Sequence, residues 1–482
     1  MPTKTEQPNI LFLFPDQLRA DFLGCYGAKF AKTPNIDWLC NNSLQYTRAI
    51  SPAPICIAAR ASMLTGLNCI KTGVFTNDQW LRPDHSECGM PTWPEVLSNA
   101  GYHTEGIGKM HFYPWDISEG FDHRVIAEDK RWLEIEDDYM DYLKDHGFQK
   151  HHGEENPGYH ENKGAACSPI PHEHQVDTWT TNQTISFLKN HNTSKPFACM
   201  VGFPGPHCPY DPPEDFSSIF HPDDMPKSLP ENEISKHFRN EMIEGAKGSW
   251  NKVDYTDFPE EKRKLVKAYY CALIHQIDIG IGRIIETLKE IGQFDNTVII
   301  LSSDHGDFVG DHGLTSKSYF LNPAMNIPIM IKLPKGQHQK INEVVSLTDV
   351  YSSILSLAGI KDGENSDSKI MHGLPHSSGP REYLFAPSHK GYMVIKGPWK
   401  YVRYFSGLKA LTNTEEDPHD QNNRINDPHC HEVLLDLQTI MEKNIDSSIK
   451  RGHQEKVVER NLKHQDIAFY ERGWQRKYPA NI

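Results

Sequence analysis

The residues with the most informative chemistry form a short string that runs from Cys56 to Arg60 with the sequence Cys-Ile-Ala-Ala-Arg. A cysteine supplies a nucleophile or an oxidisable sulfur, and an arginine four residues later lies on the same face of a helix. A helix that starts near Ile57 would also point its N-terminal amides at the side chain of residue 56. The alternative is a small buried apolar cysteine and a surface arginine paired with an acid.

Polar side chains follow four predicted strands, each at the point where an apolar run stops. The strands and the polar residues after them are Asn9–Phe14 with Asp16 and Gln17, Thr104–Ile107 with Lys109 and His111, Pro196–Phe203 with His207, and Thr297–Ser302 with Asp304 and His305. Short apolar runs of this kind are typical of strands buried on both faces. Ligands bind beyond the carboxyl ends of the strands in open parallel sheets. We therefore expect these side chains to share one active-site edge.

Helices alternate with these strands. Trp93–Ala100 and Glu260–Gly292 have the apolar spacing of helices. The alternation predicts an α/β fold with a doubly wound, mostly parallel sheet. The polar segments 113–190 and 208–260 are predicted to be long insertions, either walls of a site or plain surface loops.

The C-terminal part of the chain has a different pattern. Tyr392–Ile395 and Lys400–Phe405 are predicted antiparallel strands, and Gln465–Arg472 is a predicted closing helix. We therefore predict a catalytic α/β domain over residues 1–375 and a smaller α+β subdomain, with a small antiparallel sheet and a helix, over residues 376–482.

Composition excludes several classes of partner. With 50 basic and 64 acidic side chains the net charge is −14, and no basic stripe offsets it, so we expect no nucleic acid partner. No apolar run approaches the ~20 residues of a membrane span. Ten cysteines without framework spacing indicate mostly reduced thiols. As written, the polar N-terminus predicts a cytoplasmic protein, or an exported one if a leader was trimmed. The oligomeric state stays open, and a homo-oligomer is one option.

Oxygen ligands among the strand-end residues suggest a metal site. The carboxylates of Asp16 and Asp304 and the amide of Gln17 suit Ca²⁺ or Mg²⁺, and the imidazole of His305 also suits Mn²⁺. The alternative is that the two aspartates cap turns or helices, as most aspartates after strands do.

Several blocks, in order along the chain, resemble those of the type I sulfatases. They are Cys56-x-Ala58-x-Arg60 with Thr65-Gly66, Gly108-Lys109-Met110-His111, Pro206-His207-x-Pro209, Asp304-His305-Gly306 with Lys317, and the C-terminal Gly397–Tyr401 and Glu416–Asn423. Met110 and Phe112, on either side of His111, are similar to the choline-sulfatase branch. The resemblance implies an alkaline-phosphatase-like fold and hydrolysis of a sulfate monoester.

The resemblance also implies a modified nucleophile and one metal ion. In that family the cysteine at the position of Cys56 is oxidised to formylglycine, by a formylglycine-generating enzyme or an anaerobic sulfatase-maturating enzyme. One divalent cation, Ca²⁺ before Mg²⁺ or Mn²⁺, is then expected on five residues. These are Asp16, Gln17, Cys56, Asp304 and His305. Gln17 stands where the family often has a second aspartate.

Roles for the remaining residues follow from the same resemblance. Arg60 would hold the nucleophile, and Lys109 and Lys317 would bind sulfate oxygens. His207, with Lys317, would protonate the leaving alcohol, and His111 would be the base that releases sulfate. These cations would form a local anion pocket in a chain of net negative charge. His111 and His207 stand out among 26 histidines because each lies in a matching block.

Other functions remain open at this point. A phosphonate monoester or phosphodiester hydrolase of the same superfamily would share the Cys56 motif and metal site, but the Lys109–His111 pair favours sulfate. A protein with unmodified Cys56 that only binds anions is a third option. Aromatic residues such as Trp115 and Trp132 suit stacking on sugars, binding of a quaternary ammonium, or equally a place in the core. For the substrate we favour a sulfated carbohydrate over choline or aryl sulfate.

Overall fold

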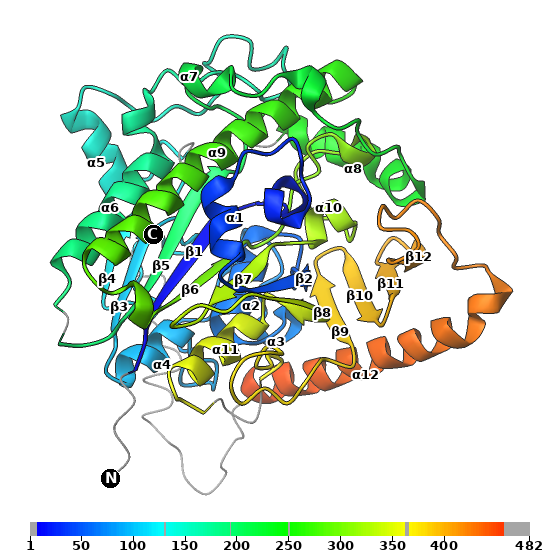
Figure 1. The fold of residues 1–482 in the computed structure, drawn as a ribbon. Coiled ribbons are helices and arrows are strands. Elements are labelled where there is room, and N and C mark those ends of the chain that lie inside the picture. The colour runs from blue at the N-terminus through cyan, green and yellow to red at the C-terminus, as the bar shows by residue number, and fades with distance from the viewer. Residues whose placement is uncertain (1–6, 130–131, 193, 249–250, 362–365, 457–482) are drawn as a thin grey trace, which may run out of the picture.

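The computed structural model describes residues 7–129, 132–192, 194–248, 251–361 and 366–456. The predicted closing helix Gln465–Arg472 lies outside these residues. Figure 1 shows an α/β core with helices on both sides of one large sheet, and a smaller sheet beside it.

The large sheet has eight strands. In spatial order they are β4 (His123–Ile126), β3 (His103–Gly108), β5 (Phe197–Pro206), β1 (Asn9–Asp16), β6 (Thr297–Ser302), β7 (Ile329–Lys332), β2 (Leu44–Ile50) and β8 (Gln339–Ser346). β7 is antiparallel to both of its neighbours, and the other adjacent pairs are parallel. The mostly parallel sheet predicted from the sequence is thus confirmed.

Helices cover both faces of this sheet. Alternate residues of β1 point to opposite faces: Leu11 and Leu13 join one apolar core, and Ile10, Phe12 and Phe14 join the other. The first core includes helices α1 (Pro34–Cys40), α6 (Val176–Asn190) and α9 (Glu260–Glu290), and the second includes α2 (Cys56–Thr65), α4 (Trp93–Asn99) and α11 (Asp349–Leu357). The remaining helices of this part are α3 (Cys69–Thr72), α5 (Asp138–Asp145), α7 (Glu214–Ser217), α8 (Glu233–Gly248) and α10 (Asn322–Met325).

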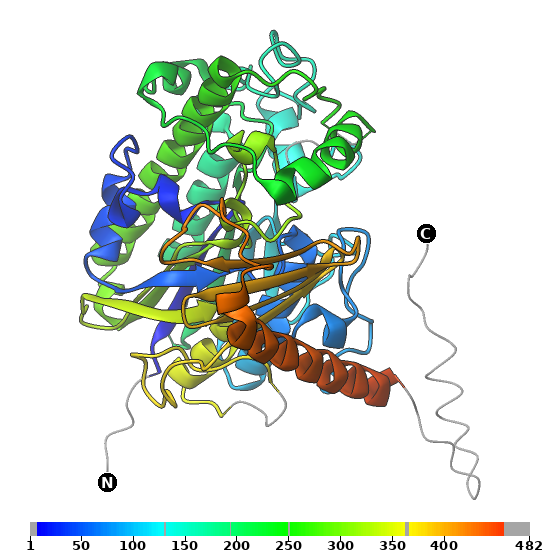
Figure 2. The same cartoon turned by 90° about the vertical axis from the view of Figure 1, so that its right-hand side faces the viewer.

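The smaller sheet lies in the C-terminal part of the chain. It is antiparallel, in the order β12 (Lys409–Asn413), β11 (Trp399–Tyr404), β10 (Gly391–Lys396) and β9 (Leu384–Ser388). The long helix α12 (His431–Lys456) packs against it through Leu437 and Met441. Figure 2 shows this helix running beneath the small sheet. The separate C-terminal sheet is confirmed, whereas the boundary between residues 375 and 376 stays a prediction.

The two predicted insertions contain regular structure. Segment 113–190 holds β4, α5 and α6, and segment 208–260 holds α7 and α8. Their polar composition hid these helices, because each buries only one stripe of apolar residues on the body of the protein. None of the described helices is both long and apolar enough to cross a membrane. All ten cysteines are free thiols.

Candidate active site

The four strand ends singled out in the sequence lie side by side. β3, β5, β1 and β6 are consecutive in the sheet and parallel, so their carboxyl ends meet at one edge. The residues that follow them, together with those of α2, form a group that we call the reaction centre. Its members are Asp16, Gln17, Cys56, Arg60, Lys109, His111, His207, Asp304, His305 and Lys317.

Helix α2 positions residue 56. The helix begins at Cys56 itself, one residue before the predicted start, and the Cys56 side chain is fully buried. The Sγ atom lies 3.1 Å from His305 Nε2 and 3.9 Å from Asp16 Oδ1. The backbone N–H of Ile57 donates to Asn77 Oδ1 at 3.1 Å. The first turn of α2 is therefore held from outside by Asn77, and residue 56 faces the carboxyl ends of the strands.

Arg60 ties the two aspartates together. Its guanidinium is fully buried and donates from Nε to Asp304 Oδ2 at 3.0 Å and from Nη2 to Asp16 Oδ2 at 3.2 Å. Nη1 donates to the carbonyl oxygen of Lys109 at 3.0 Å. The alternative of a surface arginine is wrong, because every part of this side chain is inside the protein.

Lys109 is fixed by the end of β3. Its backbone N–H donates to the carbonyl of Gly202 on β5 at 2.8 Å, and a Cβ at position 202 would clash with the Lys109 carbonyl oxygen. Glycine is thus required there for close approach. The buried ammonium lies 2.7 Å from Asp16 Oδ2 and 3.0 Å from Asp129 Oδ2.

His207 and Lys317 form a hydrogen-bonded pair. Lys317 Nζ lies 2.7 Å from His207 Nε2, and His207 Nδ1 lies 2.8 Å from the Cys208 carbonyl oxygen. Because only Nδ1–H can donate to that carbonyl, Nε2 accepts from the ammonium. Lys317 also donates to Gln17 Oε1 at 2.6 Å, and the Gln17 amide donates to Asp307.

His111 lies between the reaction centre and a cavity. Its backbone has a φ of 63°, and its N–H donates to Glu128 Oε2 at 2.8 Å. The Nδ1 atom of its imidazole is buried without a hydrogen-bond partner among the described residues. The Glu128 carboxylate therefore holds the left-handed backbone of His111 in place and so fixes the position of its imidazole ring.

Four residues of the reaction centre could hold a metal ion. Ligand atoms of Asp16, Cys56, Asp304 and His305 all lie within 4.8 Å of one another, and all four residues are buried. His305 Nδ1 donates to the Gly306 carbonyl at 2.9 Å, which leaves Nε2 facing residue 56. Gln17, the fifth residue predicted to bind the metal, has its side-chain oxygen on Lys317, and its role as a ligand stays a prediction.

The cations of the reaction centre stabilise negative charge at residue 56. Burial raises the pKa of the Cys56 thiol, but positive charge on Lys317 and His305 outweighs burial, so that pKa lies well below its usual value. Hydrogen bonds with His111 and His207 lower it further. For Lys317, burial lowers the pKa, but negative charge at residue 56 outweighs it and the pKa is raised. The site is therefore built for an anionic group.

A cavity of about 560 Å³ adjoins residue 57 and His111. We call it the aromatic cavity. Its lining residues are Ile57, Asn77, Asp78, His111, Phe112, Tyr113, Trp115, Glu128, Asp129, Trp132, Glu134 and Ile135. Most of them come from the start of the first insertion. The start of the first insertion therefore forms a wall beside the site, which is one of the two alternatives given for it, rather than a plain surface loop.

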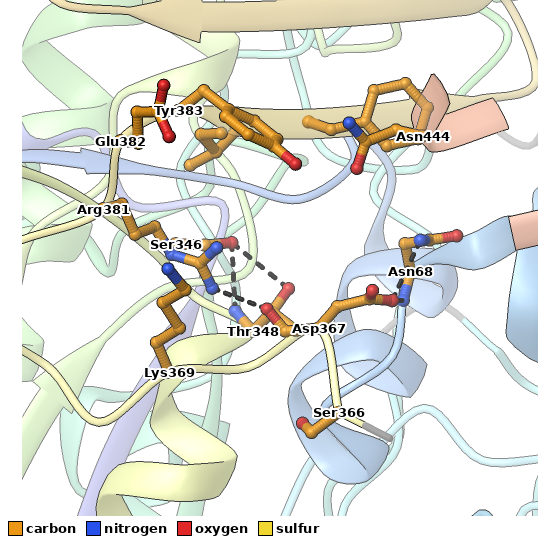
Figure 3. A pocket seen from close by; sticks show the side chains of 12 residues that line it. Asn68, Ser346, Thr348, Ser366, Asp367, Lys369, Arg381, Glu382, Tyr383 and Asn444 are labelled. Carbon is orange, nitrogen blue, oxygen red and sulfur yellow. Dashed lines mark hydrogen bonds between the residues drawn. The ribbon is translucent and has the colours of Figure 1, made fainter. Parts of the chain in front are cut away.

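A second hollow, of about 380 Å³, lies between α11 and the strand β9. We call it the subdomain pocket. Figure 3 shows Arg381 beside Lys369, and the Asp367 carboxylate turned toward Asn68. Arg381 pairs with Asp349 and also donates to the Asp367 carbonyl at 2.7 Å. This pocket contains none of the residues of the reaction centre.

Comparisons with known proteins agree with this geometry. Residues 8–360 match the family model described as Sulfatase, which is well over half of the chain. The chain belongs to the sulfatase family. It is accordingly a sulfuric ester hydrolase. Residues 310–447 also match the model described as N-sulphoglucosamine sulphohydrolase, C-terminal.

Individual relatives span nearly the whole of this sulfatase. An arylsulfatase of Clostridium perfringens is 30% identical, with 91% of this chain and 95% of the relative covered. A choline-sulfatase of Rhizobium meliloti is 28% identical, with coverage of 88% and 83%. Among solved structures, the phosphonate monoester hydrolase of Agrobacterium radiobacter superposes with a TM-score of 0.75 at 21% identity, covering 93% of this chain and 96% of that one. The last match shows a shared fold.

Sequence reasoning missed residues that support the site. Asp129 binds Lys109, Glu128 holds the backbone of His111, and Asn77 holds the start of α2. Asp129 and Glu128 follow β4, a strand too short and too polar to be recognised. Asn77 lies in a loop without regular structure, and nothing in its local sequence indicates the contact.

Proposed function

We propose that this sulfatase hydrolyses a sulfate monoester with a formylglycine formed from Cys56. The observation that carries the proposal is the setting of residue 56, which is buried at the first turn of α2 and faces Asp16 and His305. Arg60, Lys109 and Lys317 surround it with positive charge. An anionic ester fits this setting although the chain carries a net charge of −14.

The donor set fits one divalent cation. Two carboxylates, an imidazole with Nε2 free to bind, and an oxygen of the converted residue 56 would hold it, with Gln17 as a further candidate. When bound, such an ion supplies charge stabilisation for the sulfate oxygens. We favour Ca²⁺, with Mg²⁺ and Mn²⁺ as alternatives.

The first step transfers the sulfuryl group to residue 56. One hydroxyl of the hydrated aldehyde gives up its proton to water, and the resulting alkoxide, stabilised by the surrounding cations, attacks sulfur. The bond between sulfur and the alcohol oxygen breaks. His207 and Lys317 act together as the acid: the proton that the Lys317 ammonium shares with His207 Nε2, 2.7 Å away, passes to that oxygen and leaves a neutral amine beside the neutral imidazole. Lys109 and Arg60 keep Asp16 charged and in place.

The second step releases sulfate. His111 takes the proton of the other hydroxyl on residue 56, the aldehyde C=O re-forms, and the bond to the sulfate oxygen breaks. Water then hydrates the aldehyde again. A serine at this position has a single hydroxyl and offers no such elimination, which is the chemical reason to convert the cysteine.

A second candidate is hydrolysis of phosphonate monoesters or phosphodiesters, which the shared fold with a phosphonate monoester hydrolase keeps in view. Lys109 and His111 favour sulfate. For the substrate we propose a sulfated carbohydrate, because the aromatic cavity beside His111 offers Trp115 and Trp132 for stacking on the sugar. A choline or aryl sulfate, and an unmodified anion-binding protein, are the alternatives.

The test is an assay of protein batches with different degrees of conversion at residue 56. Mass spectrometry of the peptide that contains residue 56 measures conversion, since aldehyde formation lowers the peptide mass. Activity on 4-nitrophenyl sulfate should rise in proportion to the converted fraction and exceed activity on the matched phenyl phosphonate ester. Equal activity in converted and unconverted protein, or a clear preference for the phosphonate, would refute the proposal.

A further inference from the structure

We propose that Arg124 is a positioning residue for the second step of the reaction, and that it acts through Glu128 on His111. This inference rests on the proposed function and deepens it, because it names the contacts that hold the base of sulfate release in place. It predicts that loss of Arg124 slows the release of sulfate and leaves the transfer of the sulfuryl group to residue 56 largely unchanged.

The imidazole of His111 is held mainly through the backbone of that residue. Its side chain forms a hydrogen bond with residue 56, and its Nδ1 atom is buried with no hydrogen-bond partner in the part of the chain that the structure describes. The backbone at His111 has a φ of 63°, in the left-handed region that is unfavourable for residues other than glycine. Contacts from outside this residue are therefore needed to keep the ring beside residue 56.

Glu128 and Arg124 supply those contacts. Glu128 Oε2 accepts the backbone N–H of His111 at 2.8 Å, and Glu128 Oε1 accepts from Arg124 Nη2 at 2.9 Å. The two charged side chains are both buried. A hydrogen bond between charged groups is strong and directional, so Arg124 fixes the carboxylate that in turn fixes His111.

Arg124 also holds the segment that follows His111. Its Nη1 group donates to the carbonyl oxygens of Trp115 at 2.7 Å and Ile117 at 2.6 Å. The central carbon of the guanidinium lies 4.7 Å from the centre of the Phe112 ring, directly after His111 in the chain. One guanidinium thus restrains His111 through the carboxylate on its N–H and through the residues that come next.

The sheet makes room for this arginine. Arg124 lies on β4, and its partner on the neighbouring strand β3 is Gly106. A Cβ at position 106 would lie 3.3 Å from Arg124 Cγ and equally close to the ring of Phe121, so glycine allows the stem of the arginine to pack against β3. β3 also leads into Lys109 and His111. The strand that carries the reactive pair therefore places its support as well.

Displacement of His111 should leave a distinct kinetic signature. His111 is assigned to take the proton of the remaining hydroxyl on residue 56 after the alcohol has left. When this proton transfer is slow, the sulfated form of residue 56 accumulates and kcat falls. KM falls with kcat, because kcat/KM reports only the steps up to departure of the alcohol. A residue that merely supports the fold would lower kcat/KM as well.

Stopped-flow and steady-state assays of 4-nitrophenyl sulfate, on protein of measured conversion, test this signature. Arg124→Met should lower kcat about 30-fold, keep kcat/KM within about threefold of the parent protein, and release 4-nitrophenol in a burst of about one equivalent per converted site. Arg381→Met, which also removes the buried partner of a carboxylate, is the matched control and should keep the kcat and the burst of the parent protein.

A double-mutant cycle assigns the effect to His111. His111→Ala should lower kcat about 10²-fold, and Arg124→Met added to it should lower kcat by less than about twofold more, because the group through which Arg124 acts is already gone. Arg124→Lys keeps a buried cation and replaces Arg124→Met where that variant does not fold. Its ammonium cannot reach all the acceptors of the guanidinium, so it should lower kcat about fivefold with the same burst.

Each outcome has a distinct meaning. A parallel loss of kcat and kcat/KM in the Arg124 variants, or their full effect in the His111→Ala background, would overturn the inference and leave the proposed function intact. Variants of Arg124 with the kcat of the parent protein would do the same. Converted parent protein that does not cleave 4-nitrophenyl sulfate would overturn the proposed function and this inference with it.

Discussion

The reaction centre and the subdomain pocket both contain an arginine that binds an aspartate inside the protein, but the two aspartates are used differently. Asp349, the buried partner of Arg381 in the subdomain pocket, gives both oxygens to that arginine and also accepts backbone N–H groups of Ser346 and Lys369. Asp16 gives one oxygen to two cations and turns the other toward residue 56.

This difference in how the two carboxylates use their oxygens distinguishes a pair in an active site, Arg60 with Asp16, from a structural pair, Arg381 with Asp349. A carboxylate with all its acceptor positions filled by fixed donors joins segments of the chain. The segments here are α11, residues 366–369 and the entry to β9. A carboxylate that keeps one oxygen facing a nucleophile has spare capacity for a ligand. The presence of a buried ion pair alone does not separate the two cases.

Removing the nucleophile should have the largest effect. Cys56→Ala is expected to lower sulfatase kcat by roughly 10⁵-fold, because losses at a nucleophile are of this order. Steady-state hydrolysis of 4-nitrophenyl sulfate measures it. Cys69→Ala is the matched control, since this cysteine is also buried but contacts the Pro387 carbonyl near the small sheet. A Cys56→Ala protein with activity near that of the control would contradict the mechanism.

The two arginines allow a direct comparison. Arg60→Met and Arg381→Met each strip a cation from buried carboxylates, so each should lower the free energy of unfolding by about 3 kcal/mol. Arg60→Met should also lower kcat/KM about 10³-fold, because charge stabilisation at the reacting group is lost. Arg381→Met should keep kcat/KM within about threefold of the unmodified protein.

Urea unfolding and the aryl sulfate assay, run on the same samples, separate the two effects. Loss of activity in folded Arg381→Met protein would mean that the subdomain pocket belongs to the catalytic apparatus.

Loss of the acid predicted for the first step should lower kcat most for esters whose leaving alcohol is a weak acid. His207→Gln is expected to lower kcat about 10²-fold for an alkyl or sugar sulfate, whose alcohol needs a proton, and much less for 4-nitrophenyl sulfate, whose phenolate leaves unaided. The slope of log kcat against leaving-group pKa measures this. A slope equal to that of the parent protein would assign the proton transfer to another group.

A smaller, pH-dependent effect should appear at Asp311, away from residue 56. Burial raises the pKa of Asp311, but Arg19 and Lys267 outweigh it and lower the pKa to about 2. Because the folded pKa lies below the usual 3.8, the carboxylate stabilises the fold above pH 3.8, and this contribution is lost as the pH falls toward 2. The contribution is about 2 kcal/mol.

Asp311→Asn should therefore reduce unfolding free energy at pH 6 and differ less from the parent protein near pH 3. Guanidinium unfolding at the two pH values measures both differences. The same deficit at both pH values would indicate that lost packing, rather than lost charge, explains the variant.

The parts of the fold that follow from local sequence were predictable. β6 has the bounds expected for Thr297–Ser302, and β1, β3 and β5 begin within one residue of the expected starts, because their apolar runs are buried on both faces. Their parallel order then brought Asp16, Lys109, His207 and Asp304 to one edge. The predicted family, fold class and enzyme class are confirmed by comparison with known proteins.

Features that depend on tertiary contact were out of reach. The antiparallel strand β7 has only four residues and is recognised by its pairing with β6 and β2. Asp129 becomes informative only because Lys109 reaches it from another strand. The direction of the Gln17 side chain, toward Lys317 and Asp307, depends on a φ of 68° that no local pattern predicts.

The division of labour between the strand ends and the insertion has an evolutionary consequence. The groups assigned to bond breaking follow adjacent central strands of the large sheet. Tyr113, Trp115, Trp132 and Glu134 belong to a stretch of chain that contributes only the short edge strand β4 to that sheet. Mutation can change these lining side chains without disturbing the reactive groups, provided that Glu128 and Asp129, which hold His111 and Lys109, are kept. Sulfatases that descend from one ancestor can thus acquire new substrates by exchanging a few dozen residues. Grafting this stretch between relatives is a practical route to redesigned specificity.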